Sequence, residues 1–258
     1  MQNNTLQFIK DLNKKARGQL IGRYNVAIFV IMTVAFIQFI VLSMTDGAYT
    51  GSITSYLLRI VISIIVDLLT GALIFGKSQF FLNLVRGVEP ITPKDMFAGF
   101  KSGIIDKAIC VQAFYTVISL ITSIPSVLLS LGMFQISYEE YRSITAVISL
   151  VNIVFLFIEK LFIGLSFYIL SDNPEMSVPE VIKKSFELMQ NKKGRLVLIY
   201  LSSLPLLLLS ICAFFIGCLW FLAYFEALLA NFYLNAIGEE PSNPFTKPAA
   251  SSEPTPGA

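Results

Sequence analysis

Long runs of apolar residues alternate with short polar segments along the chain. Four of these runs are single blocks: Tyr24–Met44, Leu57–Gly76, Ala108–Gly132 and Ile144–Leu170. Each is close to the roughly 20 apolar residues that a helix needs to cross a bilayer core about 30 Å thick. The first block exceeds the roughly 7–15 apolar residues of a secretory signal peptide. The pattern therefore predicts four transmembrane helices in these blocks.

The last apolar run, Leu196–Ile237, is too long for a single span. As one straight helix it would extend about 63 Å, which is twice the thickness of the bilayer core. We therefore expect it to fold back near Phe214–Gly217. The sequence thus predicts an all-α polytopic membrane protein with six transmembrane helices.

Positive charges are distributed asymmetrically over the loops of this arrangement. The two loops on one side, Thr45–Tyr56 and Met133–Ser143, hold a single cationic residue, Arg142. Two further cations, Arg59 and Lys160, lie inside spans, and the rest of the 19 Lys and Arg residues lie on the opposite side. Because Lys and Arg accumulate in the cytoplasmic loops of membrane proteins, we predict that both chain termini are cytoplasmic.

The three basic segments share a pattern that suggests an internal repeat. Each has a residue that can cap a helix and a partner three positions later: Asn4 and Gln7, Thr92 and Asp95, Ser177 and Glu180. A transmembrane span follows each of them, and we predict three units, residues 4–91, 92–176 and 177–238, each with an amphipathic interfacial helix and a transmembrane hairpin. The alternative is that basic loops and interfacial aromatic residues recur because any membrane protein has them.

The segment before the first span has an apolar stripe at helical spacing, formed by Leu6, Ile9, Leu12, Ala16 and Leu20. We expect this helix to lie in the headgroup plane, with its apolar face toward the acyl chains and its lysines toward anionic lipid. Its simplest role is to tie the helix bundle to the interface, and the alternative is a lipid-sensing or partner-docking surface.

The C-terminal segment Glu239–Ala258 differs sharply from the rest of the chain because it is rich in proline and serine. Such a segment cannot bury enough apolar surface to offset its ordering entropy. We predict a disordered cytoplasmic tail.

The composition agrees with a membrane protein and excludes several classes of function. Hydrophobic residues make up 55% of the 258 residues and charged residues 14%, whereas soluble domains have about 25% charged residues. There is no histidine, so a Ser-His-Asp triad or a histidine metal site cannot form. The three cysteines are isolated in apolar runs, which argues against zinc or disulfide frameworks. The net charge of +2 is too small to suggest a nucleic-acid partner. We expect no enzymatic activity, metal or cofactor.

Charged residues inside the predicted spans are the first candidate site: Arg59, Asp67, Glu159, Lys160 and Glu226. Placing a charged side chain at the bilayer centre costs about 2.5–3.5 kcal/mol, so each of these residues is a candidate for a functional role. Arg59 lies near the outer end of its span and can snorkel to the interface, and Lys160 can reach Asp67 or Glu226. We interpret the set as ion pairs that hold the three hairpins together, or alternatively as a path for a proton, ion or substrate.

A polar stripe along the third span is the second candidate site, with members three or four residues apart: Gln112, Thr116, Ser119, Ser123, Ser126 and Ser130. This spacing keeps them on one helical face. Small and hydroxyl side chains let membrane helices approach closely and form hydrogen bonds, which favours a packing surface. The alternative is a hydrophilic groove, which a kink at Pro125 would widen.

Motifs in the C-terminal third resemble those of a known family. They are Tyr168-x-Leu170-x-Asp172-x-Pro174, then Glu180, Ser185, Leu188-Met189, Lys193 and Leu201-Ser202, and finally Leu219-Trp220, Tyr224 and Phe232-Tyr233. Through these residues the chain resembles the bacterial integral membrane family catalogued as domain of unknown function 975. The resemblance implies a six-helix protein of the bacterial cytoplasmic membrane and brings no established activity.

Two functions are compatible with these features. The first is a non-enzymatic accessory or protective protein that binds lipid, an amphipathic peptide or a membrane-protein partner, with anionic headgroups at the cytoplasmic face as expected contacts. The second is a small transporter that uses the intramembrane charges as a path. An intramembrane aspartyl protease is disfavoured because it needs two placed aspartates, and only Asp67 lies deep in a span.

Overall fold

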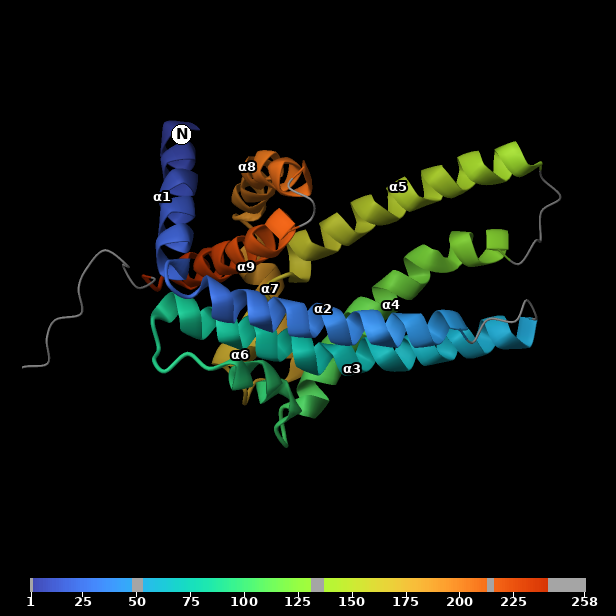
Figure 1. Ribbon diagram of the computed structural model, residues 1–258, viewed down its shortest axis with the longest axis horizontal. Helices are drawn as coiled ribbons and strands as arrows, with labels where there is room; N and C mark the ends of the chain where they lie inside the picture. The colour runs from blue at the N-terminus through green and yellow to red at the C-terminus, as the bar shows by residue number, and fades with distance from the viewer. Residues whose placement is uncertain (1, 48–52, 131–136, 213–215, 241–258) are drawn as a thin grey trace, which may run out of the picture.

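The computed structural model describes residues 2–47, 53–130, 137–212 and 216–240, and within these ranges the fold is all-α with no strand. The helices, shown in Figure 1, are α1 (Gln2–Leu20), α2 (Tyr24–Gly47), α3 (Ile53–Arg86), η1 (Pro93–Phe100), α4 (Ile105–Ser130), α5 (Tyr138–Ile163), α6 (Ser166–Asp172), α7 (Val178–Met189), α8 (Lys193–Cys212) and α9 (Ile216–Ile237). The predicted all-α class is confirmed.

Several of these helices are long and apolar enough to cross a membrane. Five spans meet this condition in the described ranges: Leu57–Arg86, Ile105–Leu129, Tyr138–Asp172, Lys193–Cys212 and Gly217–Ile237. The segments Gln7–Leu20 and Tyr24–Ile40 meet it only when taken together, and they are bent by 93° at the break between them. The fold is therefore that of a membrane-embedded protein with five or six spans, and the arrangement as three hairpins stays a prediction.

The second span is longer than the sequence predicted. α3 does not end at Gly76 but continues to Arg86, because residues beyond Gly76 keep an apolar face that is buried in the core, including Phe80, Phe81 and Leu84. This extension places Lys77 inside a helix, one residue beyond the predicted end of the span at Gly76.

The fourth span also begins earlier than predicted and is interrupted near its end. α5 starts at Tyr138, after a capping box in which the Ser137 hydroxyl accepts from the backbone N–H of Glu140. The helix breaks between α5 and α6, where the carbonyl of Ile163 accepts hydrogen bonds from the hydroxyls of Tyr115 and Ser166. These side chains stabilise the break within the bundle.

The last apolar run does fold into two helices. α8 ends at Cys212, α9 begins at Ile216, and the two helices pack against each other, as expected for a run that folds back. The predicted turn at Phe214–Gly217 falls partly on residues 213–215, which lie outside the described residues. The predicted disorder of residues 241–258 also lies outside them. At the start of the predicted tail, Glu239 forms an ion pair with Arg86, and the disordered tail stays a prediction.

α1 packs into the protein and not, as predicted, onto lipid. Its apolar residues Ile9, Leu12, Ala16 and Leu20 are buried against the rest of the bundle, where α1 contacts α9 and α8. The side chain of Leu6 lies outside the described residues. The described members of the stripe are all buried in α1, and the elements that contact α1 are mainly α9 and α8, with α3 contributing less.

The three predicted helix starts differ in the structure. The Ser177 pair is confirmed, because the backbone N–H and the hydroxyl of Ser177 both donate to the Glu180 carboxylate. Thr92 precedes the 3₁₀ helix η1, and its hydroxyl donates to Asp95 at 3.3 Å. α1 begins at Gln2, ahead of Asn4, so Asn4 does not cap it. The threefold repeat stays a prediction.

η1 packs so closely on α3 that two glycines are required. A Cβ atom at Gly76 would lie 1.7 Å from the carbonyl oxygen of Met96, and a Cβ atom at Gly99 would lie 2.0 Å from that of Ala72. The two backbones are therefore in direct contact, which fixes η1 against the C-terminal half of α3.

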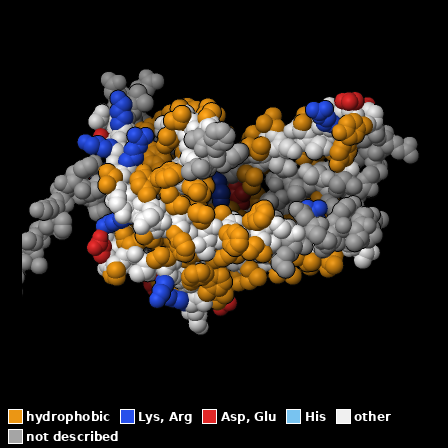
Figure 2. Space-filling view, in the orientation of Figure 1, with side chains coloured by type: hydrophobic (Ala, Val, Ile, Leu, Met, Phe, Trp, Pro, Cys, Tyr) orange, Lys and Arg blue, Asp and Glu red, His pale blue; other side chains and the backbone are white. Residues whose placement is uncertain are grey.

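The outer faces of the long helices carry large exposed apolar side chains, among them Phe36, Phe39, Ile121, Leu150 and Ile153. On the face seen in Figure 2, patches of apolar side chains extend over the described helices, and basic side chains gather over α1. Exposed apolar surface of this extent marks an interaction with lipid or with another membrane protein.

Candidate functional site

The predicted intramembrane charges are brought into one region, with Arg59 as the exception. Lys160 and Glu226 line the same cavity, of about 330 Å³, and Asp67 and Glu159 lie within electrostatic range of Lys160. Arg59 precedes Asp67 on α3 by about two helical turns, and it does not line this cavity. Figure 2 shows a hollow near the end of α5 with a basic and an acidic side chain at its floor.

The cavity is built around an ion pair that the sequence analysis did not predict. Lys77 Nζ lies 2.5 Å from Glu226 Oε1, and the Tyr168 hydroxyl donates to Glu226 Oε2 at 3.5 Å. The two charged residues are 149 positions apart in the chain. The signal that could have found Lys77 is the apolar periodicity that continues past Gly76. We name this space, lined by Lys77, Lys160, Glu226 and the rings of Tyr115, Tyr168 and Tyr200, the charged cavity.

Lys160 does not form the ion pair with Glu226 that the sequence suggested. Its ammonium group lies 4.5 Å from the centre of the Tyr115 ring, a cation–π contact that is strengthened when the groups are removed from water. Glu159, the neighbour of Lys160, is only 7% exposed. Its Oε1 has no hydrogen-bond partner among the described residues. The charged cavity therefore holds two ammonium groups and one carboxylate.

Asp67 joins the two candidate sets because it accepts hydrogen bonds from the polar stripe. Gln112 Nε2 lies 3.2 Å from Asp67 Oδ1, and Thr116 Oγ1 lies 2.5 Å from Asp67 Oδ2. Both donors come from α4, which packs against α3. This first part of the stripe is therefore a packing surface between α3 and α4.

Among the described side chains, the rest of the stripe does not join a polar network. The Ser123 hydroxyl donates to the carbonyl of Leu120 in its own helix. Ser119 is exposed and Ser126 is partly exposed, while the side chain of Ser130 lies outside the described residues. The stripe thus has two parts, and among its described side chains only those near Asp67 form hydrogen bonds with another helix.

A second charged cluster joins the ends of three helical segments. Arg86 donates two hydrogen bonds to Asp172, at 2.6 and 2.9 Å, and two to Glu239, at 2.8 and 2.6 Å. The Tyr233 hydroxyl donates to Asp172 at 2.9 Å. Bidentate arginine–carboxylate pairs are among the stronger hydrogen-bonded contacts. This cluster clamps α3 to α6 and to the residues after α9, and two of its members, Asp172 and Tyr233, belong to the sequence motifs.

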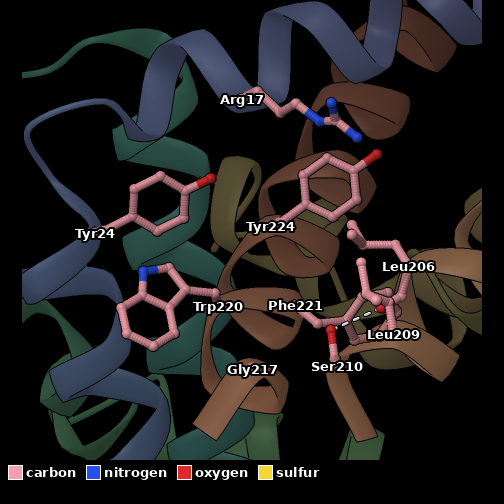
Figure 3. A pocket seen from close by; sticks show the side chains of 9 residues that line it. All are labelled: Arg17, Tyr24, Leu206, Leu209, Ser210, Gly217, Trp220, Phe221 and Tyr224. Atoms are coloured by element: carbon pink, nitrogen blue, oxygen red, sulfur yellow. Dashed lines mark hydrogen bonds between the residues drawn. The ribbon is translucent and has the colours of Figure 1, made fainter. Parts of the chain in front are cut away.

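A groove of about 360 Å³ opens between α1, the start of α2, α8 and α9. In Figure 3 the Arg17 side chain extends from α1 toward the ring of Tyr224, Tyr24 and Trp220 form the facing wall, and Leu206 and Leu209 line the α8 side. We name it the interfacial groove; it is also lined by Ser210, Gly217 and Phe221. No charged residue of the groove was proposed as a site from the sequence.

Next to the interfacial groove, an open depression of about 370 Å³ follows one face of α1. It is lined by Lys10, Asn13, Lys14, Arg17, Gly18 and Ile21, so Arg17 belongs to both spaces. Neither set of lining residues contains an acid. The arrangement is suited to an anionic group that is attached to an apolar one.

The comparisons with known proteins identify the family of the chain. No curated protein and no solved structure matches it. The family model described as "Protein of unknown function (DUF975)" matches residues 7–240, which run from α1 past the end of α9 and include the charged cavity, the Arg86 cluster and the interfacial groove. The resemblance predicted from the C-terminal motifs is thereby confirmed, and the chain belongs to the DUF975 family.

Proposed function

We propose that the protein is a non-enzymatic integral membrane protein that binds an amphipathic molecule in an accessory or protective role. The observation that carries this proposal is the pairing of two of the three intramembrane acids, Asp67 and Glu226. Asp67 accepts from two side chains of α4, and Glu226 is paired with Lys77. Acids held in such pairs contribute to packing between helices, whereas the exposed apolar faces and the interfacial groove remain open to ligands.

The candidate ligands are a lipid, an amphipathic peptide and the apolar surface of a partner membrane protein. The test is to extract the protein from native membranes in a polymer that retains surrounding lipid, and to compare the co-purified lipids and polypeptides with the bulk membrane. We expect one lipid class, peptide or protein to be enriched. A composition equal to that of the bulk membrane, with no stoichiometric polypeptide, would overturn the proposal.

The topology is part of the same proposal. The sequence places nearly all cationic residues of the loops on one side, which supports cytoplasmic termini in the cytoplasmic membrane of a bacterium. The measurement is the labelling of single cysteines by a membrane-impermeant reagent, after replacement of the three native ones. A cysteine in the Thr45–Tyr56 loop should react in intact cells, and one near the N-terminus should not; the reverse result contradicts the topology.

A second candidate function, transport, is supported by the charged cavity. Two ammonium groups and one carboxylate surround a space of about 330 Å³ within the bundle, which is suited to the passage of a proton or a small anion. The test is proton or ion flux in proteoliposomes for Asp67→Asn, Glu159→Gln and Glu226→Gln. Flux that falls in these variants, but not in the exposed control Glu187→Gln, supports transport, and flux unchanged by all of them refutes it.

A further inference from the structure

We infer that the interfacial groove binds one anionic diacyl phospholipid, with the phosphate at Arg17 and an acyl chain between α8 and α9. This inference rests on the proposed function, of which it names the ligand class and the site. It goes beyond a general attraction of basic residues to the membrane because it assigns the headgroup and the acyl chain to separate groups of residues.

The position of the groove relative to the bilayer is the first argument. The 93° bend between Gln7–Leu20 and Tyr24–Ile40 lays α1 nearly parallel to the membrane surface when α2 crosses the membrane. Tyr24 is the first residue of α2, so it marks the level at which the chain enters the bilayer. Tyr and Trp are enriched at this level in membrane proteins, and the groove contains Tyr24, Tyr224 and Trp220. The groove therefore opens at the depth of the lipid headgroups.

The charge and orientation of Arg17 are the second argument. Its guanidinium carbon lies 5.5 Å from the centre of the Tyr224 ring, and the Tyr224 hydroxyl donates to Asn13 Oδ1 at 2.8 Å. The ring is thereby held in place beneath the guanidinium. A planar guanidinium with several N–H donors matches the oxygens of a phosphate, and Lys10 in the neighbouring depression adds positive charge on the same face of α1.

The apolar end of the groove is the third argument. Leu209 is 66% exposed and Trp220 is 49% exposed, although both line a concave space. The hydroxyl of Ser210 donates to the carbonyl of Leu206 in its own helix, so it does not place an unpaired polar group on this wall. An acyl chain would cover these apolar side chains, which a free phosphate would leave exposed.

The experiment measures lipid binding to the purified, detergent-solubilised full chain by native mass spectrometry. The ligands are phosphatidylglycerol, phosphatidylcholine and glycerol 3-phosphate. We expect one phosphatidylglycerol per protein, weaker binding of phosphatidylcholine, and no binding of glycerol 3-phosphate. Competitive binding by glycerol 3-phosphate would show an anion site without an acyl site and would overturn the inference.

Three variants separate the headgroup from the acyl chain. Arg17→Gln should weaken phosphatidylglycerol binding by about tenfold, because it removes a charge-assisted hydrogen bond. Leu209→Trp keeps every charge and should weaken binding by filling the groove. Lys15→Gln removes one charge from the same helix, but Lys15 lines neither space, so its binding should match that of the unmodified protein. Size-exclusion chromatography checks that each variant is folded, and Arg17→Lys, expected to bind with intermediate affinity, replaces Arg17→Gln should that variant not fold.

The outcomes distinguish this site from the proposed function. Equal losses in Arg17→Gln and Lys15→Gln would show diffuse attraction to anionic lipid, and full binding by Leu209→Trp would exclude the acyl-chain site. Either result overturns the inference while lipid enrichment by the unmodified protein still supports the proposed function. If the unmodified protein enriches no lipid, peptide or protein, the proposed function fails as well.

Discussion

Replacing Gly76 with alanine tests the direct contact between η1 and α3. A Cβ atom at this position would lie 1.7 Å from the carbonyl oxygen of Met96, whereas ordinary van der Waals contact begins at 3.4 Å. The two backbones would have to separate by roughly 1.7 Å, the difference between these distances. Met96 is fully buried, and the clashing atom belongs to the backbone, so no side-chain rotation can relieve the overlap.

The expected cost follows from two opposing effects. Alanine in a helix is more favourable than glycine by about 1 kcal/mol, whereas overpacking of a buried contact costs about 1–3 kcal/mol. Because a backbone segment must move, we expect the overpacking cost to lie near the upper end of its range. After the gain in helix propensity is subtracted, Gly76→Ala should lower the free energy of unfolding by about 1–2 kcal/mol. In a protein of this size such a loss lowers the Tm by about 2–8 °C.

The control is Gly194→Ala, in α8. No atom lies within 4 Å of a Cβ placed there, so this substitution should leave the Tm unchanged or raise it. The assay is thermal unfolding of both variants in the same detergent, followed by size-exclusion chromatography of the heated samples. Equal Tm values for Gly76→Ala and Gly194→Ala would refute the close packing of η1 on α3.

Three further contacts are tested by substitution and measurement of the Tm. Arg86→Lys should cost about 1–3 kcal/mol, because lysine cannot make the bidentate bonds to Asp172, and Asp172→Asn should then add little; full additivity would contradict the cluster. Asp67→Asn should keep the Tm close to that of the unmodified protein, whereas Asp67→Leu should lower it by leaving two donors on α4 unpaired; equal Tm values would refute that network. Hydrogen bonds from Ser177 lower the pKa of the Glu180 carboxyl below its usual 4.5, so this cap stabilises the fold above that pH and is lost as the pH falls through the lowered pKa. Ser177→Ala should therefore give a flatter Tm profile below about pH 5, and an unchanged profile would contradict this assignment.

The helices were predictable from the sequence where lipid dictates the pattern. A run of about 20 apolar residues has few alternatives to a helix in a bilayer, so the long helices lie close to their predicted positions. The predicted helix ends were wrong where a charged residue lies inside a helix. Lys77 ended the predicted second span because hydropathy treats a lysine as a loop residue, whereas in the structure Glu226 compensates its charge.

The contacts of the candidate site were less predictable because they join distant parts of the chain. Asp67 and Glu226 were identified because a charged side chain inside a membrane is energetically unfavourable. The spacing of residues along the sequence does not show that Gln112 and Thr116 donate to Asp67, or that Lys77 pairs with Glu226. The amphipathic stripe of α1 shows the same limit. Its apolar face was evident from the spacing, but whether lipid or protein covers that face depends on where α9 lies.

The contact between the first and last helices has a consequence for the biosynthesis of the protein. The Asn231 amide donates to Gln19 Oε1 at 2.6 Å, across 212 positions of the chain. At translation rates of about 5–20 residues per second, α1 emerges from the ribosome about 10–40 s before its partner. During this interval its apolar stripe can rest on the membrane surface, as the sequence alone suggested. Docking on α9 then replaces lipid with protein, so α1 reaches its final position only after nearly the whole chain has been translated.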